Sequence, residues 1–232
     1  MARPERPWML EAPRVKLPEA AVLAFQAAWD ARSPELLPEG VPRWLFLEWL
    51  AREGYLLHGS ARSDLAEFEP RTPHDLSPDD FSKRRGVFAA SSGLWAMMYA
   101  LCDRPRVRRM LNMALQVQEP GGGWTPLRYF LSLAPRDPAI TEGRALLAPG
   151  CVYVLPPDGF EQMPPYAWPG LGAVREAHWV NPNPVRPVLR VPVMPADFPL
   201  PVLVHDAARA DALAQNDPWG FPWLEEGRGA ES

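Results

Sequence analysis

The chain has 232 residues, and 47% of them are hydrophobic, which excludes disorder throughout and supplies the material for a buried core. Its 30 prolines amount to roughly 13% of the chain, against about 5% in average proteins, and argue against long helical bundles and coiled coils. The net charge of −4 creates no chain-wide field that would attract nucleic acid or an anionic membrane, so either partner would need a local patch.

Targeting and redox signals are absent from the sequence. No stretch approaches the ~18 consecutive apolar residues of a membrane span, and the N-terminal residues MARPERP lack the apolar centre of a signal peptide. Cys102 and Cys151 are too few for a disulfide framework, and the four histidines share no metal-ligand spacing. We therefore expect a cytoplasmic protein with no membrane partner, no metal and two reduced, buried cysteines.

The N-terminal part predicts an arm and two helices. Residues 1–17 alternate prolines with charges, as in an extended arm on a domain surface. Pro18 suits the first position of a helix that runs to about residue 32. Residues 41–53 predict a second, well-buried helix that Gly54 ends.

The rest of the chain predicts strands around one further helix. A strand over residues 55–58 stops at Gly59, and a turn-rich loop covers 61–84. A strand over 86–90 leads into an apolar helix over 94–101, which a serine can cap. Short β-like runs separated by prolines, several of them expected at sheet edges, follow at 151–155, 178–180, 187–193 and 202–204. The chain ends in a helix from 207, a docking arm over 216–223 and a loose tail.

Helices followed by many short strands are typical of an α+β domain with an antiparallel or mixed sheet. We divide the chain into an N-terminal arm with two helices (1–53), a core (54–206) and a C-terminal helix with its docking arm and tail (207–232).

The sequence lacks the P-loop, the dinucleotide-binding glycine motif, the HExxH helix and the GxSxG elbow. The residues that could bind a ligand are instead grouped at 58–60 and 86–99. His58, Gly59 and Ser60 present an imidazole, backbone groups and a hydroxyl in one small volume, because the missing Cβ of glycine lets a ligand approach closely. If the strand over 86–90 lies alongside, Phe88 or Tyr99 brings an aromatic ring over the same volume. Such a corner can bind a planar amide on a flat ring.

These motifs resemble the ADP-ribosyltransferases of the diphtheria-toxin and poly(ADP-ribose) polymerase type, in particular small bacterial or phage members. That family carries a His-Gly-Ser/Thr motif on its first core strand, and this chain has HGS at 58–60. The family also has a Gly-Ile-Tyr-Phe-Ala pattern with a second tyrosine thirteen positions after the glycine, which is the spacing from Gly86 to Tyr99. The connecting loop contains FEPR at 68–71, similar to the segment of small bacterial members.

The resemblance covers residues 52–100 well and 150–195 loosely, and it implies a split antiparallel or mixed β core that binds NAD as a substrate. It implies that Gly59 and Ser60 bind the nicotinamide carboxamide, that His58 binds a ribose hydroxyl, and that Tyr99 stacks on the nicotinamide ring. Phe88 stands where the first tyrosine is usual. Arg71 and the basic runs 83–85 and 104–109 suit the NAD pyrophosphate or a nucleic-acid acceptor, or else form a solvated face.

The family normally adds a glutamate on a late strand, which bonds the ribose 2′-hydroxyl and stabilises a transition state with oxocarbenium character. In that position, directly before an aromatic, this chain has His178. Glu176 lies two residues earlier, and a period of two would keep both side chains on one face of one strand. Glu176 and His178 are therefore the candidate catalytic residues.

Three functions stay open. The first is mono-ADP-ribosyl transfer from NAD to a protein or nucleic-acid acceptor with release of nicotinamide, which is compatible with a toxin role and a neutralising partner protein. The second is a non-catalytic domain, which either binds NAD or ADP-ribose, as His178 in place of the glutamate suggests, or is a protein-interaction domain whose HGS motif is accidental. The third is an RNA 2′-phosphotransferase, for which Arg71 and Arg84 should converge on a phosphate-sized pocket.

Overall fold

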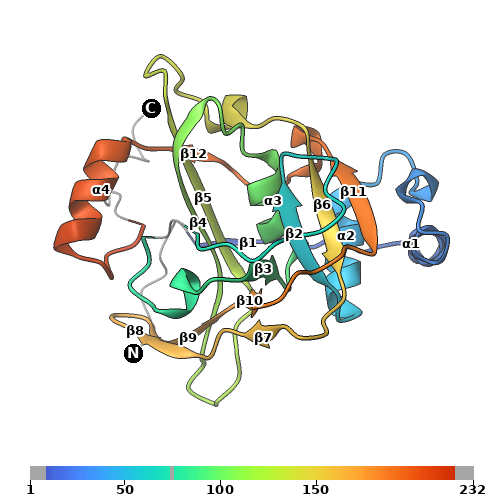
Figure 1. Ribbon diagram of the computed structural model, residues 1–232, viewed down its shortest axis with the longest axis horizontal. Helices are drawn as coiled ribbons and strands as arrows, with labels where there is room; N and C mark the ends of the chain where they lie inside the picture. Colours follow the sequence, from blue (N-terminus) through green and yellow to red (C-terminus); the bar gives the residue numbers. More distant parts are fainter. Residues whose placement is uncertain (1–8, 74–75, 223–232) are drawn as a thin grey trace.

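The computed structural model describes residues 9–73 and 76–222, and these form an α+β fold with two largely antiparallel sheets (Figure 1). The expected α+β class is therefore confirmed. The helices of the described residues are α1 (Glu19–Asp30), α2 (Arg43–Arg52), α3 (Gly93–Leu101) and α4 (Ala207–Asn216). None of these helices is long and apolar enough to cross a membrane.

The first sheet, here called the motif sheet, has the order β11-β6-β2-β3-β10-β7. Its strands are β2 (Leu56–Ser60), β3 (Val87–Ala90), β6 (Gly150–Leu155), β7 (Glu161–Gln162), β10 (His178–Asn181) and β11 (Leu189–Val193). Strand β2 pairs with β6 along its whole length but with β3 only at Leu57↔Ala90, so β2 and β3 diverge immediately after that pair. The strand expected to stop at Gly59 continues to Ser60.

The second sheet, here called the hairpin sheet, has the order β1-β5-β4-β9-β8, with β12 parallel to β5. Its strands are β1 (Leu10–Glu11), β4 (Val107–Val117), β5 (Arg128–Pro135), β8 (Tyr166–Trp168), β9 (Gly172–Glu176) and β12 (Leu203–Val204). Strands β4 and β5 are the longest of the described residues, and the sequence did not predict either of them. The glycines at 121–123 lie in the loop between these two strands.

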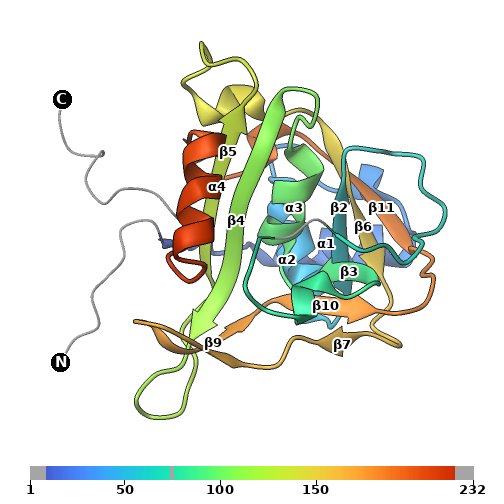
Figure 2. The same cartoon turned by 60° about the vertical axis from the view of Figure 1, so that its left-hand side comes forward.

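Helix α3 lies between the two sheets in both views (Figures 1 and 2). Its residues are apolar on every side, as a helix buried on both faces requires, and the Ser92 side chain accepts a hydrogen bond from the Trp95 N–H at its N-terminus. On the side of the motif sheet, the helix backbone packs directly on Gly59 and Gly150. On the other side, the Trp95 indole N–H donates to Asn112 Oδ1 of β4 at 2.5 Å.

The first and last segments of the described residues pack on the hairpin sheet. Leu10–Glu11 of the arm pairs with β5, and α4 lies alongside β4 on the side away from α3 (Figure 2). The described part of the predicted docking arm, residues 216–222, places the rings of Trp219 and Phe221 against Trp168. Residues 1–8 of the arm, and the tail from 223, lie outside the described residues. Both cysteines are free and buried, as expected.

Candidate functional site

A cavity of about 410 Å³, here called the first cavity, lies where β2 diverges from β3. Its walls include every cofactor-binding candidate of the sequence: His58, Gly59, Ser60, Arg71, Phe88 and Tyr99. Two segments some 30 residues apart, the HGS strand and the β3–α3 unit, therefore meet as neighbours, as the spacing argument required. The volume falls within the range of small-molecule pockets, about 300–1,000 Å³.

His58 is held as a neutral acceptor in the wall of this cavity. Its Nδ1 lies 2.6 Å from the Phe88 carbonyl oxygen, and because a carbonyl only accepts, Nδ1 carries the proton. Burial lowers the pKa of His58, and the positive charge of Arg71 lowers it further, against the opposing effect of the Phe88 carbonyl. The neutral imidazole therefore leaves Nε2 as an acceptor, which suits a sugar hydroxyl.

Gly59 has a different role from the one inferred from the sequence. A Cβ at this position would lie 1.8 Å from the Ala96 carbonyl oxygen of α3, so the missing side chain accommodates the helix and not a ligand. The Gly59 backbone still lines the first cavity beside Ser60. The Ser60 hydroxyl oxygen accepts from the Arg62 N–H at 3.1 Å, which leaves its own proton for a ligand carbonyl.

Two half-buried aromatic rings complete the first cavity. Phe88 comes from β3, and its ring lies 5.0 Å from that of His178. Tyr99 belongs to α3, its ring lies 6.5 Å from the Trp95 ring, and it lines the first cavity together with the HGS strand. Flat rings on the wall of a cavity with a neutral imidazole suit a planar heterocycle.

The two arginines expected to converge on a phosphate, Arg71 and Arg84, lie in different surroundings. Arg71 is exposed at the wall of the first cavity, where its backbone bridges to Gly86. Arg84, by contrast, donates a hydrogen bond to Glu161 at 2.9 Å and does not line the first cavity. The convergence of Arg71 and Arg84 that a 2′-phosphotransferase was expected to need is therefore not found.

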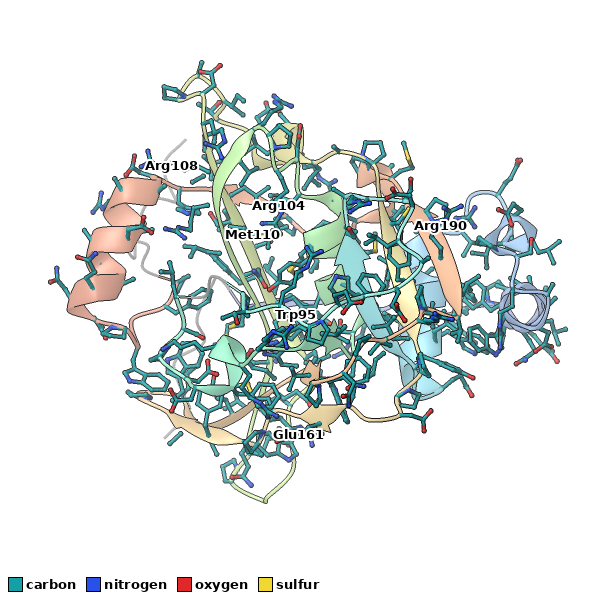
Figure 3. All side chains as sticks on the ribbon, in the orientation of Figure 1. Trp95, Arg104, Arg108, Met110, Glu161 and Arg190 are labelled. Carbon is teal, nitrogen blue, oxygen red and sulfur yellow. The ribbon has the colours of Figure 1, made fainter. Side chains whose placement is uncertain are left out.

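A second cavity of about 480 Å³ adjoins the first. The two cavities share six lining residues, here called the junction: Pro73, Ser82, Trp95, Tyr99, Arg104 and His178. The second cavity extends from the junction along β4 to the C-terminal arm, and Figure 3 shows Trp95 between the sheets, with Arg104 and Arg108 nearer the beginning of β4. The two cavities are therefore adjacent and share one wall.

The expectation that Glu176 and His178 share one face of one strand is wrong. Glu176 ends β9 and pairs with Leu115 in the hairpin sheet, whereas His178 begins β10 and pairs with Ala90 in the motif sheet. The chain changes sheets at Ala177. Both side chains nevertheless line the second cavity, and only His178 also lines the first.

The surroundings of the two candidate catalytic residues differ. Tyr166 donates its hydroxyl proton to Glu176 Oε1 at 2.6 Å, which fixes the carboxylate. The His178 ring packs against aromatic rings, with centroid distances of 5.3 Å to Trp95 and 5.5 Å to Phe81. Between residues 9 and 222, apart from 74–75, no group of three His, Cys, Asp or Glu side chains could hold a metal ion.

Apart from Glu176, the sequence did not identify the residues of the second cavity beyond the junction as a site. Arg108 was noted only as part of a basic run, and Tyr166 and Trp219 were not site candidates. Their convergence depends on the β4–β5 hairpin, which was not predicted.

A scan against protein-family models and searches of curated proteins and of solved structures found no match to this chain. Its function is therefore inferred from the geometry of the two cavities.

Proposed function

We propose that this protein transfers ADP-ribose from NAD to an acceptor and releases nicotinamide. The observation that carries the proposal is the first cavity, which the HGS strand, Phe88 and Tyr99 line together at the divergence of β2 from β3. An amide-bearing pyridine ring on a ribose needs a flat aromatic wall, polar backbone and hydroxyl groups for the amide, and an acceptor for a sugar hydroxyl. The cavity offers all three.

In this proposal each candidate residue of the first cavity has one role in binding NAD. The Gly59 backbone and the Ser60 hydroxyl bind the carboxamide, and Tyr99 stacks on the nicotinamide ring with Phe88 close by. His58 accepts a hydrogen bond from a ribose hydroxyl through Nε2, and Arg71 binds a phosphate of the pyrophosphate.

The reaction is a displacement at the ribose anomeric carbon. The C1′–N bond breaks, nicotinamide leaves with the electron pair, and the ribose develops oxocarbenium character. His178 stands in the wall common to both cavities, where it can hold the ribose as the bond breaks. Glu176 lines only the second of these two cavities, so in this mechanism it acts on the acceptor and not on the nicotinamide side.

The test is incubation of the full chain with NAD, with nicotinamide release followed chromatographically and binding followed by thermal shift. NAD at 100 times its Kd adds about 2.7 kcal/mol to the stability, which in a chain of this size raises the melting temperature by roughly 5–10 °C. We expect His58→Ala and Tyr99→Ala to lose most of this shift, and Tyr99→Phe, which keeps the ring, to retain it. Absence of a shift at millimolar NAD contradicts the proposal.

A second candidate function is NAD binding without transfer. The observation that favours it is the absence of a carboxylate at position 178, together with the position of Glu176 outside the first cavity. A thermal shift with NAD but no nicotinamide release would establish this candidate. Release that is lost in His178→Ala, together with transfer to an acceptor that is lost in Glu176→Gln, would establish the transferase if both variants keep the thermal shift.

A further inference from the structure

The second cavity carries two arginines that the fold does not use. Arg104 and Arg108 are exposed at its wall, and within residues 9–73 and 76–222 neither has a carboxylate partner. Their neighbour Arg109 is different, because its guanidinium bonds the Asp211 carboxylate of α4 at 2.8 Å. In a chain with a net charge of −4, two unpaired guanidiniums at one cavity form a local site for anionic groups.

The same cavity has an aromatic wall. Tyr166, Trp168 and Trp219 pack on one another with ring centroids 6.0–6.2 Å apart. Trp168 is buried, and its indole N–H donates to the Trp219 carbonyl at 3.0 Å, so the group is held in place. The rings of Tyr166 and Trp219 are only half-buried, and both line the cavity. They offer flat apolar surface to a ligand.

We propose that the second cavity binds the acceptor, and that this acceptor is a single-stranded nucleic acid. Arg104 and Arg108 bind its backbone phosphates, while a base stacks on Trp219 and Tyr166. An acidic peptide would satisfy the arginines, but it lacks a flat ring at each repeat of its backbone, whereas a nucleotide combines both groups in one unit. This inference deepens the proposed function and rests on it for the transfer step.

The junction brings the two substrates together. After nicotinamide leaves the first cavity with the electrons of the C1′–N bond, a nucleophilic oxygen or nitrogen of the acceptor forms a new bond to C1′ from the second cavity. The proton that this nucleophile loses passes to the Glu176 carboxylate, which Tyr166 holds at the wall of the second cavity. The products are nicotinamide and the ADP-ribosylated acceptor.

Binding is tested without NAD, so that its outcome does not depend on the proposed reaction. The probes are fluorescently labelled 12-nucleotide single strands of mixed-sequence DNA and RNA, and the readout is fluorescence anisotropy of the full chain from 50 to 200 mM salt. Two phosphate contacts predict a slope of log affinity against log salt of about −1.4, and Arg108→Ala should reduce it to about −0.7. Arg85→Ala is the matched control, because Arg85 is also exposed but lines neither cavity, and its slope should equal that of the wild type.

The aromatic wall is tested separately. Trp219→Ala should weaken binding by roughly 5- to 150-fold without changing the salt slope, and Trp219→Phe should restore most of the affinity. No binding of either strand at 50 mM salt overturns the inference, as do equal losses in Arg108→Ala and Arg85→Ala. ADP-ribosylation of a protein but not of the strands also overturns it. Binding of the strands without nicotinamide release would instead contradict the proposed reaction alone.

Discussion

Replacing Gly59 by alanine tests how the HGS strand and α3 are fitted together. The new Cβ would lie 1.8 Å from the Ala96 carbonyl oxygen and 2.7 Å from the Ala100 nitrogen. Ordinary contacts begin at 3.4 Å, so helix and strand must separate by about 1.6 Å at this point. Both clashing atoms belong to the helix backbone, so no side-chain rotation can relieve them.

Overpacking of this kind costs about 1–3 kcal/mol of the free energy of unfolding. For a chain of this size, each kcal/mol lowers the melting temperature by about 2–4 °C, so Gly59→Ala should melt roughly 2–12 °C below the wild type in the absence of ligand. Gly121→Ala is the matched control, because Gly121 lies in the β4–β5 loop with nothing within 4 Å of its added Cβ. If the two variants melt within about 1 °C of each other, the direct packing of α3 on Gly59 is refuted.

Three further outcomes follow from buried or bonded side chains. Burial raises the pKa of Glu48, whose Oε1 accepts hydrogen bonds at the start of α3. The free energy of unfolding of the wild type should therefore fall as pH rises from about 4.5 through the folded pKa. Urea titrations at a series of pH values should show no such loss in Glu48→Gln. Burial lowers the pKa of His205 from 6.5 to about 4. About 3 kcal/mol of the free energy of unfolding present above pH 6.5 should therefore be lost as pH falls to 4. His205→Asn should abolish this loss in the same urea titrations. Tyr166→Phe removes the hydrogen bond to Glu176 and should slow transfer to an oligonucleotide roughly tenfold without altering the NAD thermal shift. A loss of the thermal shift as large as the loss of transfer would contradict the assignment of Glu176 to the acceptor side.

The features that the sequence predicted well are those fixed by neighbours along the chain. The buried helix α2 and the Ser92 cap of α3 follow from local apolar spacing and from one side chain three residues from its partner. The edge position of β11 follows from Pro192, which cannot donate to a ladder, and β11 does lie at one end of the motif sheet.

The β4–β5 hairpin was missed because two arginines follow the first residue of β4, and both were assigned to a basic run that binds anionic groups or forms a solvated face. The signal was nevertheless present in the alternation of Leu111, Met113, Leu115 and Val117, all buried on one face of β4. Asn112 and Gln116 interrupt the apolar pattern, but both are engaged in hydrogen bonds, Asn112 to Trp95 and Gln116 to Thr125. Such partners are close in space but lie 9 to 17 residues away along the chain, and a periodicity argument cannot supply them.

The error over Glu176 and His178 has a single physical cause at Ala177. A period of two holds only within one strand, and Ala177 is bonded to both sheets: its N–H donates to the Ala114 carbonyl of β4 at 3.1 Å, and its carbonyl accepts from the Ser91 N–H after β3 at 2.9 Å. These two bonds join elements that no local pattern connects. They turn one continuous polar-apolar run into the end of one strand and the beginning of another.

The change of sheets at Ala177 also determines how the two substrates of the proposed reaction can be aligned. Glu176 belongs to the hairpin sheet and His178 to the motif sheet. The distance between the bound acceptor and the ribose of NAD therefore depends on how firmly the two sheets are joined. Among the contacts of the described residues that join them are the bonds of Ala177, the packing of α3 on Gly59, and the Trp95–Asn112 hydrogen bond on the opposite side of that helix. These contacts lie at or beside the junction, and none involves a charged side chain, so salt should not loosen them. The salt dependence expected for the acceptor therefore arises from Arg104 and Arg108 alone, which is why the slope of binding against salt reports on those two contacts and not on the fold.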